Sequence, residues 1–146
     1  MGLNLQPGQK LFVDTAPLIY LMEGTGERAE KVGRLLDQCT RGGVSWVTSL
    51  VTYMELLVLP ARKGLTALAG KYRDFLTNSD QVSLHPIDLA VADAVVDLRA
   101  RYGLKTPDAI QLATARLCGA DFILTNDRDW ERVAADFPII TVDGSL

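Results

Sequence analysis

The chain has few of the residues that build disulfide-rich or zinc-binding proteins. Its 146 residues include two cysteines and one histidine. Cys39 and Cys118 have no paired spacing and are typical of small apolar residues within helices in a reducing compartment. His85 stands alone beside a proline, and we expect it to have a structural role. These counts argue against a disulfide scaffold and against a zinc or copper site.

Long apolar runs and targeting signals are also missing. No apolar stretch approaches the roughly 20 residues that span a bilayer, and the N-terminal sequence MGLNLQPGQK lacks a basic segment followed by an apolar core. We therefore expect a cytoplasmic protein without a membrane partner. The length and a 48% apolar composition predict one globular domain over residues 1–146.

The chain has no excess of positive charge, since 15 lysines and arginines against 18 aspartates and glutamates give a formal net charge of −3. This argues against a general nucleic-acid coat protein, which is usually basic. It does not argue against an enzyme that acts on nucleic acid, because a bound cation would neutralise part of the acidic charge. The basic residues gather into groups that are either solvated helix faces or substrate contacts: Arg62 with Lys63, Lys71 with Arg73, and Arg99 and Arg101 with Lys105.

Short apolar runs alternate with longer helical patterns along the chain. Strands are expected at residues 11–14, 44–48, 82–87, 122–125 and 139–142. Helices are expected from Pro17, over 27–39, from Ser49 towards Pro60, over 66–76, from Asp88 to near Gly103, from Thr106 to Gly119 and over 130–135. This alternation predicts a three-layer α/β/α sandwich with a mainly parallel sheet. Ligand sites in such sheets lie beyond the carboxyl ends of the strands.

Several acidic residues occur at places compatible with this edge of the sheet. Asp14 ends the first strand, and Asp127 follows a later one. Glu55 is the only charged residue of SLVTYMELLVLPA, and a helix that is apolar nearly all round is expected to be buried. A lone buried carboxylate is costly unless it pairs with an arginine or binds a metal ion.

Each acid has a simpler explanation when it is taken alone. Asp108 follows a threonine–proline pair, which as N-cap and first helical residue would start a helix whose dipole favours an anion. Asp14 suits a strand end, where Thr15 can donate a local hydrogen bond. Asp127 and Asp129 suit a solvated turn.

Taken together, Asp14, Glu55, Asp108 and Asp127 favour a metal site. Four acids at one edge would repel one another severely without a cation. Oxygen ligands without clustered histidine or cysteine suit Mg²⁺ or Mn²⁺. Such ions favour phosphodiester chemistry. The chain has no Walker-type or dinucleotide glycine motif and no GxSxG elbow that would point to another chemistry.

Three segments of the chain, taken together, form a specific pattern: FVDTAPLIYL, SLVTYMELL and TPDAIQLATARLCGADFILTNDRDW. In this order they resemble PIN-domain nucleases, specifically the VapC-like ribonuclease toxins of prokaryotic toxin–antitoxin pairs. The resemblance implies an α/β/α fold and Mg²⁺- or Mn²⁺-dependent RNA cleavage that leaves a 5′-phosphate and a 3′-hydroxyl. It also implies a homodimer that an antitoxin protein neutralises.

Carried over residue by residue, the resemblance assigns the acidic metal site to Asp14, Glu55, Asp108 and Asp127. Thr125 and Asn126 match polar residues that support the last acid. Asp129 either caps the next helix or matches a further acid that only some members use. Pro107 stands where the family often has alanine, and Trp130 stands where it often has phenylalanine. Neither change removes a ligand, and Trp130 is expected to be the apolar lid of its helix.

Two alternatives stay open at this point. A catalytically silent PIN domain would bind RNA or assemble with other proteins, but such a domain is expected to lose one or more acids, and all four are present. A receiver domain of a response regulator also has acids around Mg²⁺ at strand ends. It requires an adjacent acidic pair after the first strand and a lysine after the last, where this chain has FVDT and ITVDGS.

Overall fold

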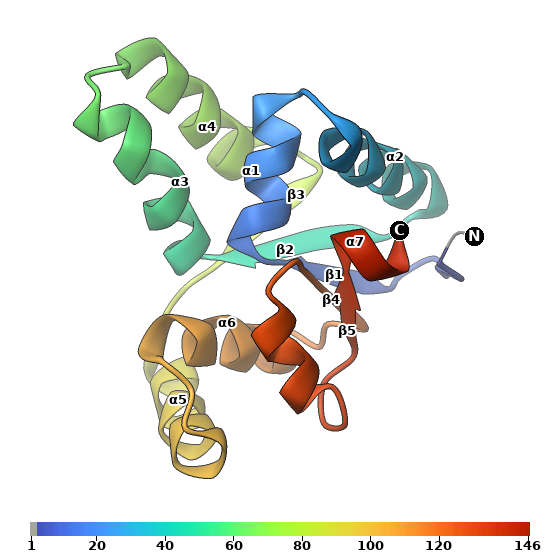
Figure 1. Ribbon diagram of the computed structural model, residues 1–146, viewed down its shortest axis with the longest axis vertical. Helices are drawn as coiled ribbons and strands as arrows, with labels where there is room; N and C mark the ends of the chain where they lie inside the picture. The colour runs from blue at the N-terminus through green and yellow to red at the C-terminus, as the bar shows by residue number, and fades with distance from the viewer. Residues whose placement is uncertain (1–2) are drawn as a thin grey trace.

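A five-stranded parallel sheet forms the centre of the computed structural model, which describes residues 3–146 (Figure 1). Its strands are β1 (Lys10–Val13), β2 (Ser45–Ser49), β3 (Val82–His85), β4 (Phe122–Thr125) and β5 (Ile139–Thr141). The order is β3-β2-β1-β4-β5, and every neighbouring pair is parallel. The strand order reverses between β1 and β4, where ligand sites of open parallel sheets form. Receiver domains have the order 2-1-3-4-5, so that alternative is wrong.

The helices on one face of the sheet are α1 (Thr15–Glu23), α2 (Glu27–Gly42), α3 (Leu50–Arg62), α4 (Thr66–Asn78) and the short α7 (Val142–Ser145). Their apolar side chains pack on the sheet around Leu11, Val32 and Trp46. Ser49 starts α3 because its side chain accepts hydrogen bonds from two backbone N–H groups of the first turn. Gly43 ends α2 with φ of 73°, which favours glycine.

The other face is covered by α5 (Leu89–Tyr102), α6 (Thr106–Leu117) and the 3₁₀ helix η1 (Arg128–Val133). A second core cluster fills this layer, with Phe12, Leu112 and Trp130 fully buried. Asp88 starts α5 by accepting the backbone N–H of Val91 at 2.9 Å. The sheet is therefore covered on both faces, which agrees with the apolar character of its strands.

The predicted α/β/α sandwich and its parallel sheet are confirmed, and the differences lie at element ends. α6 begins at Thr106, so Lys105 and not Thr106 occupies the N-cap position. The helix expected over 130–135 is η1. The last strand ends at Thr141, whose hydroxyl accepts the N–H of Gly144 and starts α7, a helix that the sequence analysis missed. Within the described residues, no helix is both long and apolar enough to cross a membrane.

Candidate acidic site at the carboxyl edge of the sheet

Asp14 lies directly after β1, at the point where the strand order reverses. Its side chain is only 9% exposed. Its Oδ1 accepts a hydrogen bond from Gln111 Nε2 at 3.0 Å, and its Oδ2 accepts one from Thr125 Oγ1 at 2.7 Å. Burial raises the pKa of Asp14, and these neutral donors lower it only in part. The protein therefore holds a desolvated carboxylate with two neutral hydrogen-bond partners.

Asp127 is connected to Asp14 through one side chain. The buried hydroxyl of Thr125, at the end of β4, also accepts the backbone N–H of Asp127 at 3.1 Å. The carboxylate of Asp127 is exposed, and its Oδ1 accepts the backbone N–H of Asp129 at 2.9 Å. Asp127, and not Asp129, is thus the N-cap of η1. The segment that contains Asp127 and Asp129 is therefore both a solvent-exposed turn and a part of the candidate site.

Asp108 is half-buried in the first turn of α6. Burial raises its pKa most, and the negative charge of Asp127 raises it further, with a smaller contribution from Asp129. These acids therefore lie close enough to repel one another. The indole N–H of Trp130 makes no hydrogen bond within residues 3–146, yet it lies near enough to Asp108 to lower its pKa. Trp130, which the sequence predicted to be an apolar lid, therefore also places its buried indole N–H near the carboxyl group of Asp108.

The expectation that Glu55 is buried is wrong. Glu55 is exposed, because α3 packs through Val51, Leu56 and Pro60 and Glu55 lies on the side that these residues leave open. Met54, Val58 and Leu59 are 56%, 49% and 53% exposed. The apolar sequence predicts a helix that is buried on all sides, but part of the surface of α3 is open to solvent. The exposure of Glu55 also excludes the alternative of a buried ion pair between Glu55 and an arginine.

Glu55 nevertheless faces the same region of the molecule. Its charge raises the pKa of Asp14, although this is the smallest of the causes. Glu55 also lines a groove of about 240 Å³ between α1, α3 and α4, together with Ile19, Leu59 and Tyr72. It stands where this apolar groove approaches the acidic site.

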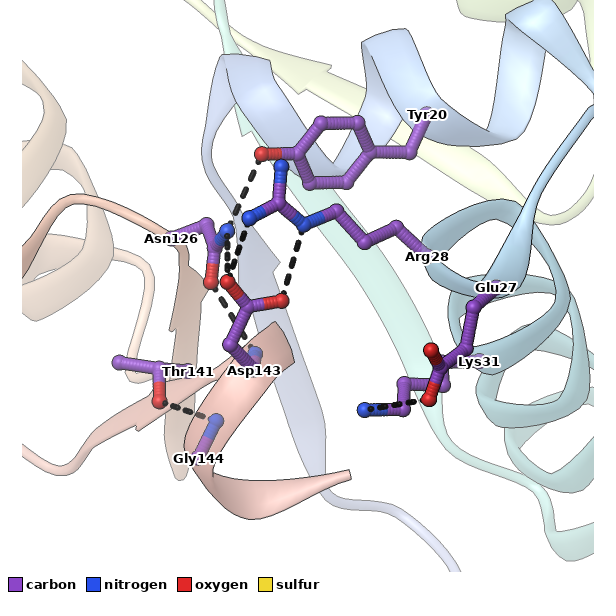
Figure 2. Close-up of polar contacts among 8 residues, drawn as sticks. All are labelled: Tyr20, Glu27, Arg28, Lys31, Asn126, Thr141, Asp143 and Gly144. Atoms are coloured by element: carbon purple, nitrogen blue, oxygen red, sulfur yellow. Dashed lines mark hydrogen bonds and ion pairs between the residues drawn. The ribbon is translucent and has the colours of Figure 1, made fainter.

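Asn126 has polar partners other than Asp127. Its Nδ2 donates to Tyr20 Oη and to Asp143 Oδ2, both at 3.1 Å, and its Oδ1 accepts the backbone N–H of Asp143 at 3.1 Å (Figure 2). Arg28 forms a two-point ion pair with Asp143, at 2.6 Å and 2.9 Å. Asn126 therefore joins β4 to α1 and α7, and Arg28 extends the connection to α2.

Gln111 was missed by the sequence analysis. It is 2% exposed, and its amide contacts Asp14, Thr52 and Ser49. Thr15, expected to serve Asp14, faces Thr52 with 3.1 Å between the two hydroxyl oxygens. Its backbone also lowers the pKa of Asp14. The only signal in the sequence was a glutamine three residues after Asp108, between the apolar residues Ile110 and Leu112.

The residues present are chemically compatible with a hard divalent cation. Within residues 3–146, no three acidic, histidine or cysteine side chains stand close enough to hold one ion as they are. The ion pairs of the described chain also leave out Asp14, Glu55, Asp108 and Asp127. Asp14 therefore has no positive partner for its buried charge, and the surrounding donor atoms are oxygens, which suit Mg²⁺ or Mn²⁺.

The region from residue 11 to residue 136 matches the model of the PIN domain family. The chain belongs to the PIN domain family. This match contains all four candidate acids and confirms the family resemblance seen in the sequence. A sequence comparison with curated proteins gave no match.

Solved structures of related PIN domains share the fold over nearly the whole chain. A toxin–antitoxin complex from Klebsiella pneumoniae has 27% identity and a TM-score of 0.70, covering 90% of this chain and 97% of that one. VapBC2 from Rickettsia felis, bound to a promoter DNA fragment, has 12% identity and a TM-score of 0.75, covering 91% and 98%. VapC20 from Mycobacterium tuberculosis, described as a sarcin-ricin loop cleaving toxin, has 21% identity and a TM-score of 0.68, covering 87% and 95%. The similarity to the Rickettsia felis and Mycobacterium tuberculosis structures is evidence for the fold of this chain alone.

Proposed function

We propose that this PIN domain is a Mg²⁺- or Mn²⁺-dependent endoribonuclease and the toxin of a toxin–antitoxin pair. The observation that carries the proposal is the buried carboxylate of Asp14, which has only neutral hydrogen-bond partners and stands at the strand-order reversal with Asp108 and Asp127. Membership of the PIN family and the 27% identity to a toxin–antitoxin complex support it.

In this proposal Asp14, Asp108 and Asp127 hold the metal ion. A bound divalent ion would lower the pKa of water and stabilise charge on the phosphodiester oxygens. Thr125 and Gln111 keep the Asp14 carboxylate in place. Glu55, on the exposed side of α3, either completes the site or orients the attacking water and accepts its proton at a carboxylate oxygen. Asp129 serves as an outer ligand.

The test is RNA cleavage by site variants that keep their fold. Asp14→Asn and Asp108→Asn should each abolish cleavage, and excess EDTA should stop the wild-type protein. Asp37→Asn is the matched control, because Asp37 is an exposed aspartate of α2 away from the sheet edge. Full activity of Asp14→Asn, or of the wild type in excess EDTA, would contradict the assignment.

We propose that the antitoxin docks on the exposed apolar side of α3 and α4. Met54, Val58, Leu59 and Leu65 are 46–56% exposed there, beside the groove that contains Glu55. Contiguous exposed apolar surface marks interaction sites, and an occupant of this groove would also cover Glu55. Leu59→Glu should therefore cleave RNA normally and resist its antitoxin, while growth arrest on expression tests the toxin role itself.

We also propose a homodimer in the cytoplasm. α5 lies on the other side of the sheet from α3 and α4 (Figure 1). It exposes Leu89 and Val96 at 76% and 67%, and a second copy would cover them. Light scattering on the purified protein should give a mass of twice the 15.9 kDa chain. A strictly monomeric species would exclude this part of the proposal.

A further inference from the structure

We propose that Gln111 is a positioning residue that holds the Asp14 carboxylate in one orientation for cation binding. The inference rests on the proposed function, since the role of Asp14 as a metal ligand belongs to that proposal. It adds a side chain from the middle of α6, one helical turn after Asp108.

The amide of Gln111 has a hydrogen-bond partner for both of its hydrogens and for its oxygen in a buried position. Its Nε2 donates to Asp14 Oδ1 at 3.0 Å and to Thr52 Oγ1 at 2.8 Å. Its Oε1 accepts the hydroxyl of Ser49. Both hydrogens and the oxygen therefore have partners, and three segments of the chain meet at this one side chain.

The cap of α3 fixes which way the amide points. Ser49 Oγ accepts the backbone N–H groups of Val51 at 3.1 Å and Thr52 at 3.4 Å, so its own hydrogen is directed to Gln111 Oε1. A reversed amide would set its oxygen against the carboxylate of Asp14, and neither atom carries a hydrogen. The orientation that donates to Asp14 is the one that satisfies all partners.

The carboxylate of Asp14 is consequently held at both oxygens from two elements, by Gln111 of α6 and Thr125 at the end of β4. A carboxylate has about four lone-pair directions, so each oxygen keeps capacity for a cation. Both donors are neutral. They fix the direction of the carboxylate and leave its negative charge intact. A lysine or arginine at either position would instead neutralise that charge.

A purely structural glutamine would have different consequences. Such a residue would join α6 to the start of α3, and its loss would lower stability without altering the cation affinity of protein that remains folded. A positioning residue affects that affinity in the folded state, because the carboxylate then samples orientations that do not bind.

Gln111→Met tests the difference, with Thr114→Val as the matched control. Methionine keeps the length of the side chain and removes its polar atoms. Thr114 is buried on the same helix, but its hydroxyl donates to the carbonyl of Ile110 and touches none of the acids. Calorimetry with Mn²⁺ should show about tenfold weaker binding for folded Gln111→Met. The kcat for RNA should fall by a similar factor with KM unchanged, and Thr114→Val should match the wild type in both.

A crystal structure of metal-free Gln111→Met separates this inference from the proposed function. We expect the Asp14 carboxylate to turn or to occupy two conformers. That readout holds even if the wild-type protein neither binds Mn²⁺ nor cuts RNA, in which case only the proposed function falls. Gln111→Asn, one methylene shorter, gives the same readouts if the methionine variant does not fold. An unchanged Asp14 conformer together with wild-type Mn²⁺ affinity would overturn the inference.

Discussion

Thr125 donates to the Asp14 carboxylate and accepts the backbone N–H of Asp127, so one buried hydroxyl connects two candidate metal ligands. The two bonds are compatible because a hydroxyl is both donor and acceptor. β1 and β4 are neighbouring parallel strands, and this places Asp14 and Thr125 side by side at their ends. The alignment of β1 with β4 therefore determines how Asp14 and Asp127 are positioned relative to each other.

Thr125→Val should damage both stability and cleavage. Valine has a similar shape but leaves one oxygen of Asp14 and one backbone N–H with a lost partner, which costs roughly 1–3 kcal/mol of unfolding free energy. Urea unfolding and RNA kinetics measure the two effects. Thr48→Val is the control, because its buried hydroxyl donates to the carbonyl of Val13 and touches no acid. Wild-type kinetics in Thr125→Val would contradict the coupling.

Asp14→Asn should stabilise the metal-free protein at neutral pH while it abolishes cleavage. Burial raises the pKa of Asp14 in the folded state. The folded state therefore binds the proton more tightly than the unfolded one, and wild-type stability falls as pH rises from the ordinary carboxyl value through the raised one. Asparagine has no such dependence, and its amide can donate to Thr125. Thermal unfolding against pH in EDTA should show the two proteins diverging as pH rises, and parallel curves would refute this.

Trp130→Phe should raise the pKa of Asp108 further. The indole N–H lowers that pKa, and phenylalanine keeps the aromatic packing without the donor. Carboxyl NMR titration of the metal-free protein measures the change. Trp46→Phe is a matched control, since Trp46 is the other buried indole whose N–H has no partner among the described residues, and it belongs to the other core cluster. If the pKa of Asp108 were the same in Trp130→Phe and Trp46→Phe, an effect of the Trp130 indole N–H on Asp108 would be excluded.

The Arg28–Asp143 pair should make stability depend on acid and salt. Arg28 and Asn126 lower the pKa of Asp143 to about 2. A depressed pKa means that the pair stabilises the fold above the ordinary carboxyl value and that this contribution is lost as pH falls towards 2. Asp143→Asn should therefore lower Tm at neutral pH, and less so in high salt because both side chains are about half exposed. The difference in Tm from the wild type should close as pH falls through 2, where Asp143 takes up its proton. Glu30→Gln, which removes a 4.0 Å surface pair with Arg34, should change little.

Features that depend on nearby residues could be predicted from the sequence. The strand ends that present Asp14 and Asp127, and the caps Ser49 and Asp88, follow from local patterns of apolar and capping residues. These patterns were sufficient to predict the parallel sheet and the positions of Asp14 and Asp127 directly after strands β1 and β4. The family match then confirmed the resemblance.

Features set by contacts between distant segments could not be predicted. The exposure of Glu55 depends on which face of α3 the neighbouring helices cover, and an apolar sequence does not specify this. Gln111 contacts Asp14 across 97 positions, and Asn126 finds Asp143 across 17. The sequence indicates that a buried polar residue requires hydrogen-bond partners, but only the folded structure determines which residues these partners are.

The crossover in strand order also governs when during synthesis the proposed activity can arise. β1, β2 and β3 come from the first 85 residues, whereas β4 and Asp127 come from positions 122–127. A growing chain that stops before Phe122 lacks the strand that pairs with β1 on the acidic side, and with it the hydroxyl that steadies Asp14. An unfinished product of translation would therefore lack the complete proposed site, and the proposed nuclease arises only once almost the whole chain has been made.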